Sequence, residues 1–371
     1  MTVPDSSDIC IVGGGPAGLA AAIAITKAGY GVVLFDCAVP PIDKACGEGL
    51  LPDGLAALKI LGVELPSEAG HPFKGIRFSD GSSVAFATFS GRTGLGLRRT
   101  ALHSVLVQRA QQVGVQLCWG VKNVQLAAGV LSVNGSAVKS NFVIAADGQN
   151  SAMRRQAGLT RIVRESRRYG FRRHYRIQPW SSYMELHWGK RSQLYVTPVA
   201  SDEVGVALIS RDPTLRLDCA LNEFPEVRSR LQGAAFSSSE RGALSVSRRL
   251  HRISTNNLAL IGDASGSVDA LTGEGIGLAF RQSLVLADAL KSGSLENYRV
   301  QHRRLSRRPR LMAGLLLLLD KHPGLQRRVL ASLASHPAAF EAMLEFHVGE
   351  GSLSDLFSWR VLDFCRGFLS Y

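Results

Sequence analysis

One stretch of the chain combines a carboxylate with unusually bare backbone. In LIGDASGSVDALTGEGIGLAF, Asp263 follows an apolar run and Gly262, and Gly273 and Gly275 come a few residues later. A carboxylate accepts hydrogen bonds from hydroxyl groups, whereas glycines let the backbone approach a flat ring closely. A helix that begins at these glycines directs its positive end at negative charge on such a ring. The stretch predicts contact with a hydroxylated, ring-bearing ligand, and a capped strand-to-helix turn is the structural alternative.

A second glycine-rich stretch near the N-terminus, DICIVGGGPAGLAAAIAITKAGYGVVLFD, predicts a site for phosphates. Its glycines have the G-x-G-x-x-G spacing. The first allows a tight turn, the second lets a pyrophosphate approach, and the third lets helix and strand pack closely. The free N–H groups of the helix N-terminus favour negative charge, and an acid after the second strand suits the adenosine ribose. The expected contacts of this dinucleotide site are Gly13, Gly15, Pro16, Ala17, Gly18 and Asp36.

Regular elements must hold both stretches in place. The N-terminal stretch predicts a strand at 9–12, a helix at 16–28 and a strand at 32–35, and the later stretch predicts a strand at 258–261 and a helix from about 275 to 290. FAD is long enough to use both, with its adenosine on the first unit and its ribityl chain and flavin on the second. The predicted cofactor is therefore non-covalent FAD, whose second half should contact Gly262, Asp263, Gly273, Gly275 and Ile276.

The chain carries no second G-x-G-x-x-G motif. We therefore expect the flavin to be reduced either by NAD(P)H that binds transiently or by a separate electron donor. The six cysteines show no C-x-x-C pair and no His-rich spacing. This pattern predicts neither a metal site nor a disulfide.

The length and the charge of the chain limit the number of domains and the kinds of partner. The 371 residues, 46% of them hydrophobic, suit two interleaved domains. The net charge of +13 is concentrated in seven arginines between 161 and 176 and in RRLSRRPR at 303–310. A solvated face explains such clusters, and anionic lipid headgroups are an alternative partner. Nucleic acid is unlikely because no DNA- or RNA-binding motif accompanies the charge.

No signal-peptide pattern precedes the first glycine turn, and the longest apolar run, 311–319, is far shorter than the roughly 20 residues that span a bilayer. We expect a cytoplasmic protein. Peripheral contact with an anionic membrane stays open, as does the oligomeric state.

Four motifs together carry a family resemblance. GGGPAGLAAA, RRTALHSVLVQRA, VIAADGQNSAMRR and GDASGSVDALTGEGI occur in the order found in the flavoprotein superfamily of para-hydroxybenzoate hydroxylase, which the chain resembles over roughly residues 5–300. KACGEG and VDALTGEGI are similar to loops of its geranylgeranyl reductase branch. The chain departs from the pattern at Ala270, where the reductases usually have proline. It also lacks their aromatic-rich Tyr-x-Trp-x-Phe-Pro motif, keeping only Tyr195 and Pro198 in LYVTPV.

The resemblance implies further cofactor contacts. Arg99, at the start of a helix, would contact the FAD phosphate or ribityl region, and Asp147 would support the pyrophosphate. Val124 would lie beside the adenine through its backbone. The KACGEG loop would approach the flavin ring with Lys44, Ala45, Cys46 and Gly47.

Two side chains of this loop are the candidate catalytic groups. The resemblance places Cys46 near the flavin, where a thiol can donate a proton or shape the pocket, and Lys44 with a nearby dipole would favour the thiolate. A small packing residue is the alternative. Glu48 is a candidate proton relay, and an exposed loop carboxylate is its alternative.

The expected fold is α/β. The resemblance implies a Rossmann-like FAD-binding domain of the glutathione reductase type, as in para-hydroxybenzoate hydroxylase, with an inserted antiparallel-sheet substrate domain and a C-terminal helical segment. The runs YMELHW, QLYVTPV and EVGVALIS alternate as strands of the inserted sheet do. The FAD-binding domain is expected at 1–75, 99–160 and 251–300, the substrate domain at 76–98 and 161–250, and the helical cap at 301–371.

Three functions remain open at this stage. The loop motifs favour an FAD-dependent oxidoreductase that reduces carbon–carbon double bonds of a hydrophobic small molecule, such as an isoprenoid, quinone or polyketide-like compound. The first alternative is an NAD(P)H-dependent flavin monooxygenase that hydroxylates an aromatic or polyketide substrate. The second is a non-enzymatic escort protein that binds prenyl or lipid groups. The intact glycines and the acids Asp36 and Asp263 argue against this last role.

Overall fold

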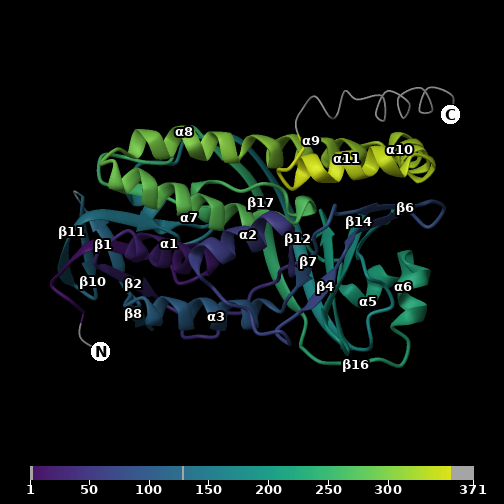
Figure 1. The fold of residues 1–371 in the computed structure, drawn as a ribbon, viewed down its shortest axis with the longest axis horizontal. Helices are drawn as coiled ribbons and strands as arrows, with labels where there is room; N and C mark the ends of the chain where they lie inside the picture. The colour runs from purple at the N-terminus through teal and green to yellow at the C-terminus, as the bar shows by residue number, and fades with distance from the viewer. Residues whose placement is uncertain (1–2, 128, 352–371) are drawn as a thin grey trace.

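The computed structural model describes residues 3–127 and 129–351, so Cys365 and the last part of the expected cap lie outside the described residues. Two sheets lie side by side, with long helices along one side of both (Figure 1). The fold is the predicted α/β class. Strands from three separate stretches build the first sheet, and strands from the intervening stretches build the second.

The seven-stranded sheet forms the half of the molecule that contains the N-terminus. Its central strands are parallel and read as apolar runs, because helices cover them. The predicted strands at 9–12, 32–35 and 258–261 are confirmed with small shifts at their ends. In spatial order the strands are β8 (Gln116–Trp119), β2 (Val32–Asp36), β1 (Ser6–Val12), β11 (Ser136–Ala145), β10 (Val130–Val133) and β9 (Val124–Ala127), with β18 (Leu258–Leu260) on β11.

Helices cover this sheet and bring the two glycine-rich stretches together. Helix α1 (Pro16–Lys27) packs closely on α7 (Gly275–Lys291), although about 250 residues separate them in the chain. Both helices begin where the sequence predicts. The remaining helices of this half are α2 (Pro52–Leu61), α3 (Arg99–Gln112) and α4 (Ala152–Gln156).

The eight-stranded sheet is mostly antiparallel, and the three predicted runs form three of its neighbouring strands. The expected domain boundaries near residues 75 and 160 fall beside its first strand and its longest strand. Its order is β16 (Ala235–Phe236), β12 (Ile162–Arg176), β15 (Glu203–Ser210), β14 (Ser192–Ala200), β13 (Met184–Trp188), β5 (Gly75–Ser79) and β6 (Val84–Thr88), with β17 (Arg241–Leu250) on β12. Nearby are helices α5 (Leu217–Ala220) and α6 (Pro225–Arg230), and a small sheet of β3 (Gly49–Leu50), β7 (Gly94–Gly96) and β4 (His71–Phe73).

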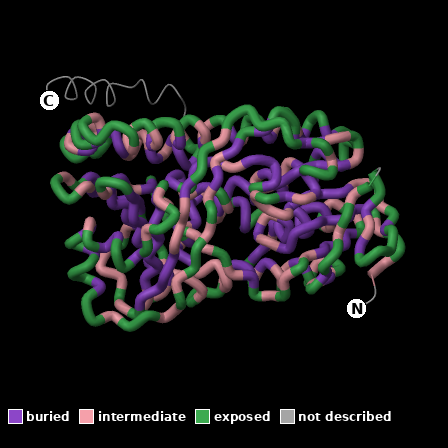
Figure 2. Tube along the Cα trace, turned by 180° about the vertical axis from the view of Figure 1, so that it is seen from behind, coloured by how far each residue is buried: buried purple, intermediate pink, exposed green. Residues whose placement is uncertain are grey.

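The C-terminal helices run along one side of both sheets. They are α8 (Leu295–Leu305), α9 (Arg307–Lys321), α10 (Pro323–Ser335) and α11 (Pro337–His347). Helices α10 and α11 pack on β6 of the second sheet, and the ring of Phe340 lies 4.8 Å from that of Phe78. Much of the outward side of these helices is exposed, whereas the strands beneath are buried (Figure 2). Within the described ranges, none of the helices is long and apolar enough to cross a membrane.

Candidate cofactor and active site

The first glycine turn joins β1 to α1 with no room for side chains on its protein side. Gly13 has a left-handed φ of +114°, and a Cβ on Gly18 would lie 1.8 Å from the carbonyl oxygen of Gly13. A Cβ on Gly15 would meet no atom within 4 Å. The turn therefore packs tightly on one side and leaves open space at Gly15, where Pro16 begins the helix.

Asp36 lies at the end of β2, beside this turn. Its carboxylate accepts hydrogen bonds from the backbone N–H of Gly14 at 2.5 Å and of Ala38 at 2.7 Å. The backbone N–H of Val121 donates to the carbonyl of Asp36, and the carbonyl of Gly14 lies 2.9 Å from Nε2 of His103. The carboxylate thus fixes the glycine turn and has lone pairs left for a ribose.

Sequence reasoning missed the residues around Asp36. His103 is buried, and burial lowers its pKa, so it stays neutral against Gly14. The ring of Trp119 lies where a Cβ on Gly14 would be. Val124, the predicted adenine contact, begins β9, and β1, β11 and β10 separate β9 from β2 in the sheet order. The residue whose N–H bonds to Asp36 is Val121. The glycine before it, Gly120, follows the end of β8 and was the signal in the sequence that a strand ends there.

The second predicted stretch begins in the short 3₁₀ helix η2 (Gly262–Ser265). Gly262 has a φ of +57° and packs against the Cβ of Ala17, which joins this loop to the first turn. The side chain of Asp263 is exposed to solvent, although many protein atoms lie around its carboxylate. Desolvation by the surrounding protein raises the pKa of Asp263, and the charges of Arg99 and Lys44 oppose the rise. The rise applies fully only when a ligand excludes water from the carboxylate.

The loop at 44–48 lies between the two domains. The carbonyl of Gly47 accepts a hydrogen bond from Thr197 of β14 at 2.7 Å, and a Cβ on Gly47 would enter open space. The ammonium of Lys44 lies about 4.0 Å from the Cβ position of Gly148. The expectation that Lys44 favours a thiolate at Cys46 is wrong. Burial raises the pKa of Cys46, and this outweighs the opposing charge of Arg99, so the thiol stays protonated.

Glu48 is buried rather than exposed, which corrects the alternative of a solvated loop carboxylate. Its backbone has a left-handed φ of +59°, and its N–H donates to Sγ of Cys46 at 3.4 Å. One carboxylate oxygen accepts the N–H of Arg99 at 2.9 Å, and the other lies 2.5 Å from Nε2 of His174. A strained backbone fixed by several bonds is typical of a functional position.

His174 connects Glu48 to the edge of the second sheet. Its Nδ1 lies 3.1 Å from Nη1 of Arg172 and 2.8 Å from Oγ of Ser238. Arginine only donates, so Nδ1 accepts and Nε2 carries the hydrogen that faces Glu48. Arg172 also pairs with Asp43. The side chains of Glu48, His174 and Ser238 therefore form a hydrogen-bonded chain, and the backbone N–H of Glu48 joins Cys46 to it.

Arg99 begins α3 at the place where several predicted residues meet. Its charge acts on the pKa values of both Cys46 and Asp263. Its Nε is buried and has no hydrogen-bond partner among the described residues. A buried guanidinium nitrogen left in this way is expected where an anionic ligand group supplies the partner.

The loop before α7 brings the remaining glycines to the same region. The 3₁₀ helix η3 (Ala270–Thr272) ends at Gly273, with φ of +67°, and Gly275 then opens α7 and Ile276 follows it. A Cβ on Gly275 would meet no atom within 4 Å. Glu274, between the glycines, is buried, and burial raises its pKa, while His347 of α11 and Arg281 lie near its carboxylate. The C-terminal helices thus support this loop.

Asp147 lies at the end of β11, where its carboxylate accepts the N–H of Met153 at 3.1 Å and so caps α4. Its other oxygen is buried and has no partner within the described part of the chain. Ala45 lies in the loop beside Lys44. The described residues fit FAD: open glycine positions at 15, 47 and 275, a free carboxylate at Asp263, and partnerless polar atoms on Arg99 and Asp147.

Comparison with known proteins decides the family. The model of the FAD binding domain family matches residues 6–221. The chain belongs to this family. It is an FAD-dependent oxidoreductase with the fold of flavoproteins similar to para-hydroxybenzoate hydroxylase.

Curated relatives of this flavoprotein have several named activities. It is 29% identical to a menaquinone reductase of Mycobacterium tuberculosis over 328 residues, covering 80% of this chain and 79% of the relative. A putative FAD-dependent monooxygenase of Bacillus subtilis is 26% identical, with 76% and 84% covered. A digeranylgeranylglycerophospholipid reductase of Methanothermobacter thermautotrophicus is 29% identical, with 57% and 58% covered.

Solved structures share the fold at low identity. A flavoprotein/dehydrogenase from Cytophaga hutchinsonii superposes with a TM-score of 0.82 at 16% identity, covering 98% of this flavoprotein and 99% of that chain. The halogenase PltM in complex with phloroglucinol and FAD gives a TM-score of 0.73 at 17% identity, with 98% and 85% covered.

Proposed function

We propose that this flavoprotein reduces a carbon–carbon double bond in a hydrophobic, isoprenoid-bearing substrate, as a member of the geranylgeranyl reductase branch. The polar chain from Cys46 through Glu48 and His174 to Ser238 carries this proposal. Reduction of an alkene requires two electrons and two protons, which arrive as one hydride equivalent and one proton. Bound FAD supplies the hydride equivalent.

The protein supplies the proton in this proposal. Burial holds the pKa of Cys46 above its usual value, so its Sγ carries a proton near neutral pH. After Sγ gives this proton to the substrate carbon, the backbone N–H of Glu48 donates to the thiolate and stabilises it until water reprotonates it. Ser238 is half-buried and forms the outer end of the hydrogen-bonded chain through His174 to the Glu48 carboxylate, which holds this loop in place. An acid positioned in this way contributes roughly 100-fold or more to a rate.

The surroundings favour a hydrophobic substrate. Met184 lies between the two loops, since a Cβ on Gly49 would lie 2.5 Å from its Sδ and one on Gly273 would lie 4.0 Å from its Cε. Tyr195 donates to the carbonyl of Leu271 at 2.5 Å, and both belong to an apolar cluster with Met184. A flexible thioether among apolar groups adapts to long hydrocarbon chains. The named reductase relatives support the same class of substrate.

NAD(P)H, bound transiently, is the electron donor in this proposal, and a separate reductant is the alternative. Monooxygenation is the second candidate function, and the putative monooxygenase relative that covers 76% of the chain favours it. The two functions differ in the product: the first adds two hydrogens and the second adds one oxygen atom.

The test begins with the FAD-loaded protein, reduced anaerobically and mixed with a polyprenyl naphthoquinone or geranylgeranyl diphosphate. We expect the flavin to reoxidise and the organic product to gain two hydrogens. The quinone product is analysed after exposure to air, which returns a quinol ring to the quinone and leaves a reduced tail unchanged. A product carrying one extra oxygen in aerated buffer, or no turnover of either substrate class, overturns the proposal.

The role of the thiol is tested with Cys46→Ser. We expect turnover to fall on the order of 100-fold with FAD retained. Cys37→Ser changes an exposed cysteine and is the matched control, which should keep its rate. If Cys46→Ser turns over as fast as the control, the thiol is not the proton donor.

A further inference from the structure

A basic groove is lined by residues other than those of the cofactor site. It has a volume of about 610 Å³, a size typical of small-molecule sites. Its walls come from the start of β12, from the end of β17 with the loop after it, and from α8 and α9. The lining residues are Val163, Arg249, Leu250, His251, Arg252, Ile253, Arg299, His302, Arg303, Arg307 and Arg310, with no acidic side chain among them.

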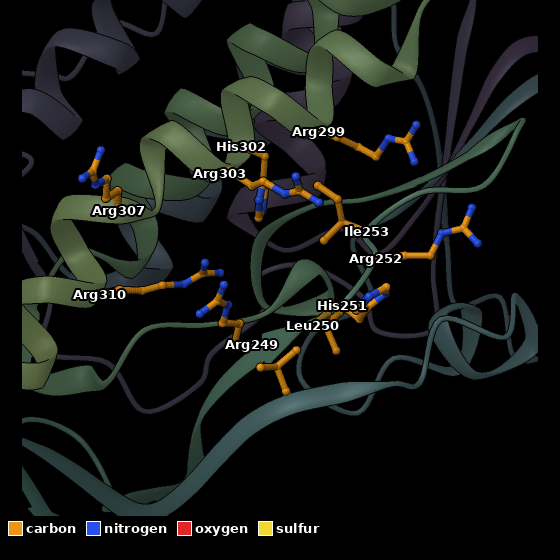
Figure 3. Close-up of a pocket in the computed structure, with 11 residues that line it drawn as sticks. Arg249, Leu250, His251, Arg252, Ile253, Arg299, His302, Arg303, Arg307 and Arg310 are labelled. Carbon is orange, nitrogen blue, oxygen red and sulfur yellow. The ribbon is translucent and has the colours of Figure 1, made fainter.

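Arg249, Arg303 and Arg310 come to this groove from three elements, β17, α8 and α9. The guanidinium groups of Arg249 and Arg310 lie side by side, whereas Arg303 extends toward Ile253 and Arg252 points away (Figure 3). Arg303 lines the same groove, and its charge acts on His302 together with that of Arg310. None of the three has a carboxylate partner within residues 3–127 and 129–351. By contrast, Arg299 at the other end pairs with Glu296. Arginine is suited to phosphate because its planar donors match the geometry of the phosphate oxygens.

His302 adds a neutral donor to the floor of the groove. Its Nε2 lies 3.1 Å from the amide nitrogen of Gln282 and 2.9 Å from Oγ of Ser265. An amide nitrogen only donates, so Nε2 accepts and Nδ1 carries the hydrogen. Burial, with Arg310 and Arg303 nearby, lowers the pKa of His302 to about 3, which keeps the ring neutral. Nδ1 has no hydrogen-bond partner in the described part of the chain.

The like charges repel one another without a ligand. Arg310 is partly buried, and this burial together with the charge of Arg249 lowers its pKa. Protein sites seldom keep converging cations without an anion, because their repulsion and desolvation both cost free energy. We propose that the groove is a binding site for a phosphate or diphosphate group, held by Arg249, Arg303 and Arg310 with the Nδ1–H of His302.

Two sources could present such a group, a soluble phosphate ester or the headgroup of an anionic lipid. Helix α9 favours the lipid. Leu311, Leu315 and Leu318 are 45%, 41% and 45% exposed, and their spacing with Arg307 places all four on one face of the helix. Leucines beside phosphate-binding arginines are the pattern of helices that lie in a membrane interface.

The proposal is tested by binding to two probes. Inorganic pyrophosphate is titrated into the FAD-loaded protein by calorimetry at low and moderate salt, and sedimentation with vesicles compares phosphatidylglycerol with pure phosphatidylcholine. The variant Arg303→Gln/Arg310→Gln is compared with Arg327→Gln/Arg328→Gln, which removes the same charge from exposed positions of α10 outside the groove. We expect the groove variant to bind about tenfold more weakly and the control to bind as the wild type does.

The outcomes separate the two sources. Pyrophosphate binding that depends on the groove arginines supports a soluble phosphate ligand. Sedimentation with phosphatidylglycerol vesicles that depends on them supports the lipid. If neither probe binds, or if the two variants lose binding equally, the groove is not a phosphate site. The melting temperature gives an independent measure. At low salt the groove variant should have a higher melting temperature than the wild type, because two repelling charges are gone. Pyrophosphate should raise the melting temperature of the wild type and the control only.

Discussion

The two sheets of this flavoprotein bury different kinds of residue. In the seven-stranded sheet the central strands are apolar, and residues such as Ile9, Val33 and Leu260 are fully buried. In the eight-stranded sheet, strands of comparable burial carry ionisable side chains, including Arg172 and Glu185. At the first sheet, the predicted contacts with FAD are mostly backbone groups of the glycine turns. The second contributes side-chain chemistry, and each buried charge there requires a partner from another segment.

The partners in the second sheet come from far along the chain. His174 of β12 meets Glu48 from the loop after the first unit, and Arg168 of the same strand meets Asp320 of α9. Glu185 of β13 lies 3.4 Å from Nη1 of Arg77 in β5. The comparison teaches that the first sheet is sensitive to added volume and the second to lost charge.

The largest effect is expected for Gly18→Ala in the first sheet. The new Cβ would overlap the carbonyl oxygen of Gly13, so α1 must move away from β1. We expect a loss on the order of 3 kcal/mol in the free energy of unfolding, together with loss of FAD. Urea unfolding followed by circular dichroism measures the first, and flavin absorbance after gel filtration measures the second.

Gly15→Ala is the matched control for that prediction. Its new Cβ enters open space, and the backbone at Gly15, with φ of −72°, accepts alanine. Stability should change by less than about 1 kcal/mol, while FAD binding weakens because the methyl group occupies the expected place of the pyrophosphate. Equal loss of stability in the two variants would contradict the assignment of tight packing to Gly18.

A comparable loss of stability is expected in the second region, for Glu48→Gln. Both carboxylate oxygens of Glu48 face donors, Arg99 N–H and His174 Nε2–H, so the new amide NH2 must face a donor. Arg172 also loses a nearby negative charge. We expect a loss on the order of 3 kcal/mol in unfolding free energy, measured by urea.

Glu64→Gln is the matched control, because it removes the same carboxylate charge from an exposed position. It should leave stability within about 0.5 kcal/mol of the wild type. A similarly small change for Glu48→Gln would show that the polar chain beneath Cys46 contributes little to the fold.

The smallest effect is expected for the pH dependence of stability that comes from His302. This residue of α8 contacts Ser265, next to Asp263. Burial lowers the pKa of His302 to about 3, against about 6.5 in the unfolded chain. Between these values the unfolded chain binds more protons, so stability falls as the pH falls. We expect His302 to account for about 2 kcal/mol of the stability lost between pH 7.5 and pH 5.

The variant His302→Gln should lose that part of the pH dependence, and His322→Gln, at an exposed position, should keep it. The measurement is urea unfolding at the two pH values for all three proteins. An unchanged pH dependence in His302→Gln would mean that burial does not lower the pKa of this histidine in the folded protein.

Much of the first region could be predicted from sequence because its requirements are local. The G-x-G-x-x-G spacing, the strand before it and the acid after it all lie within one short window. The same holds for the turn at Asp263 and for the start of α7 at Gly275, which the structure places as predicted. Backbone that must turn tightly leaves glycine in the sequence whatever the rest of the chain does.

Predictions that depended on contacts between distant segments fared worse. Glu48 is buried because β12 brings His174 to it, and burial, which no local pattern reveals, sets the direction of the pKa change at Cys46. The bond from the Val121 N–H to the Asp36 carbonyl was not predicted, because it joins the chain after β8 to the end of β2.

The sequence by itself determined the α/β class, the two glycine-rich turns and the cofactor they suit, since each follows from backbone geometry within a single stretch. Only the tertiary structure decided which charges are buried, which histidines are neutral, and that arginines from β17, α8 and α9 surround one groove. The physical reason is that burial and electrostatics depend on which atoms come within a few ångströms of one another, and in this flavoprotein those atoms belong to segments up to hundreds of residues apart.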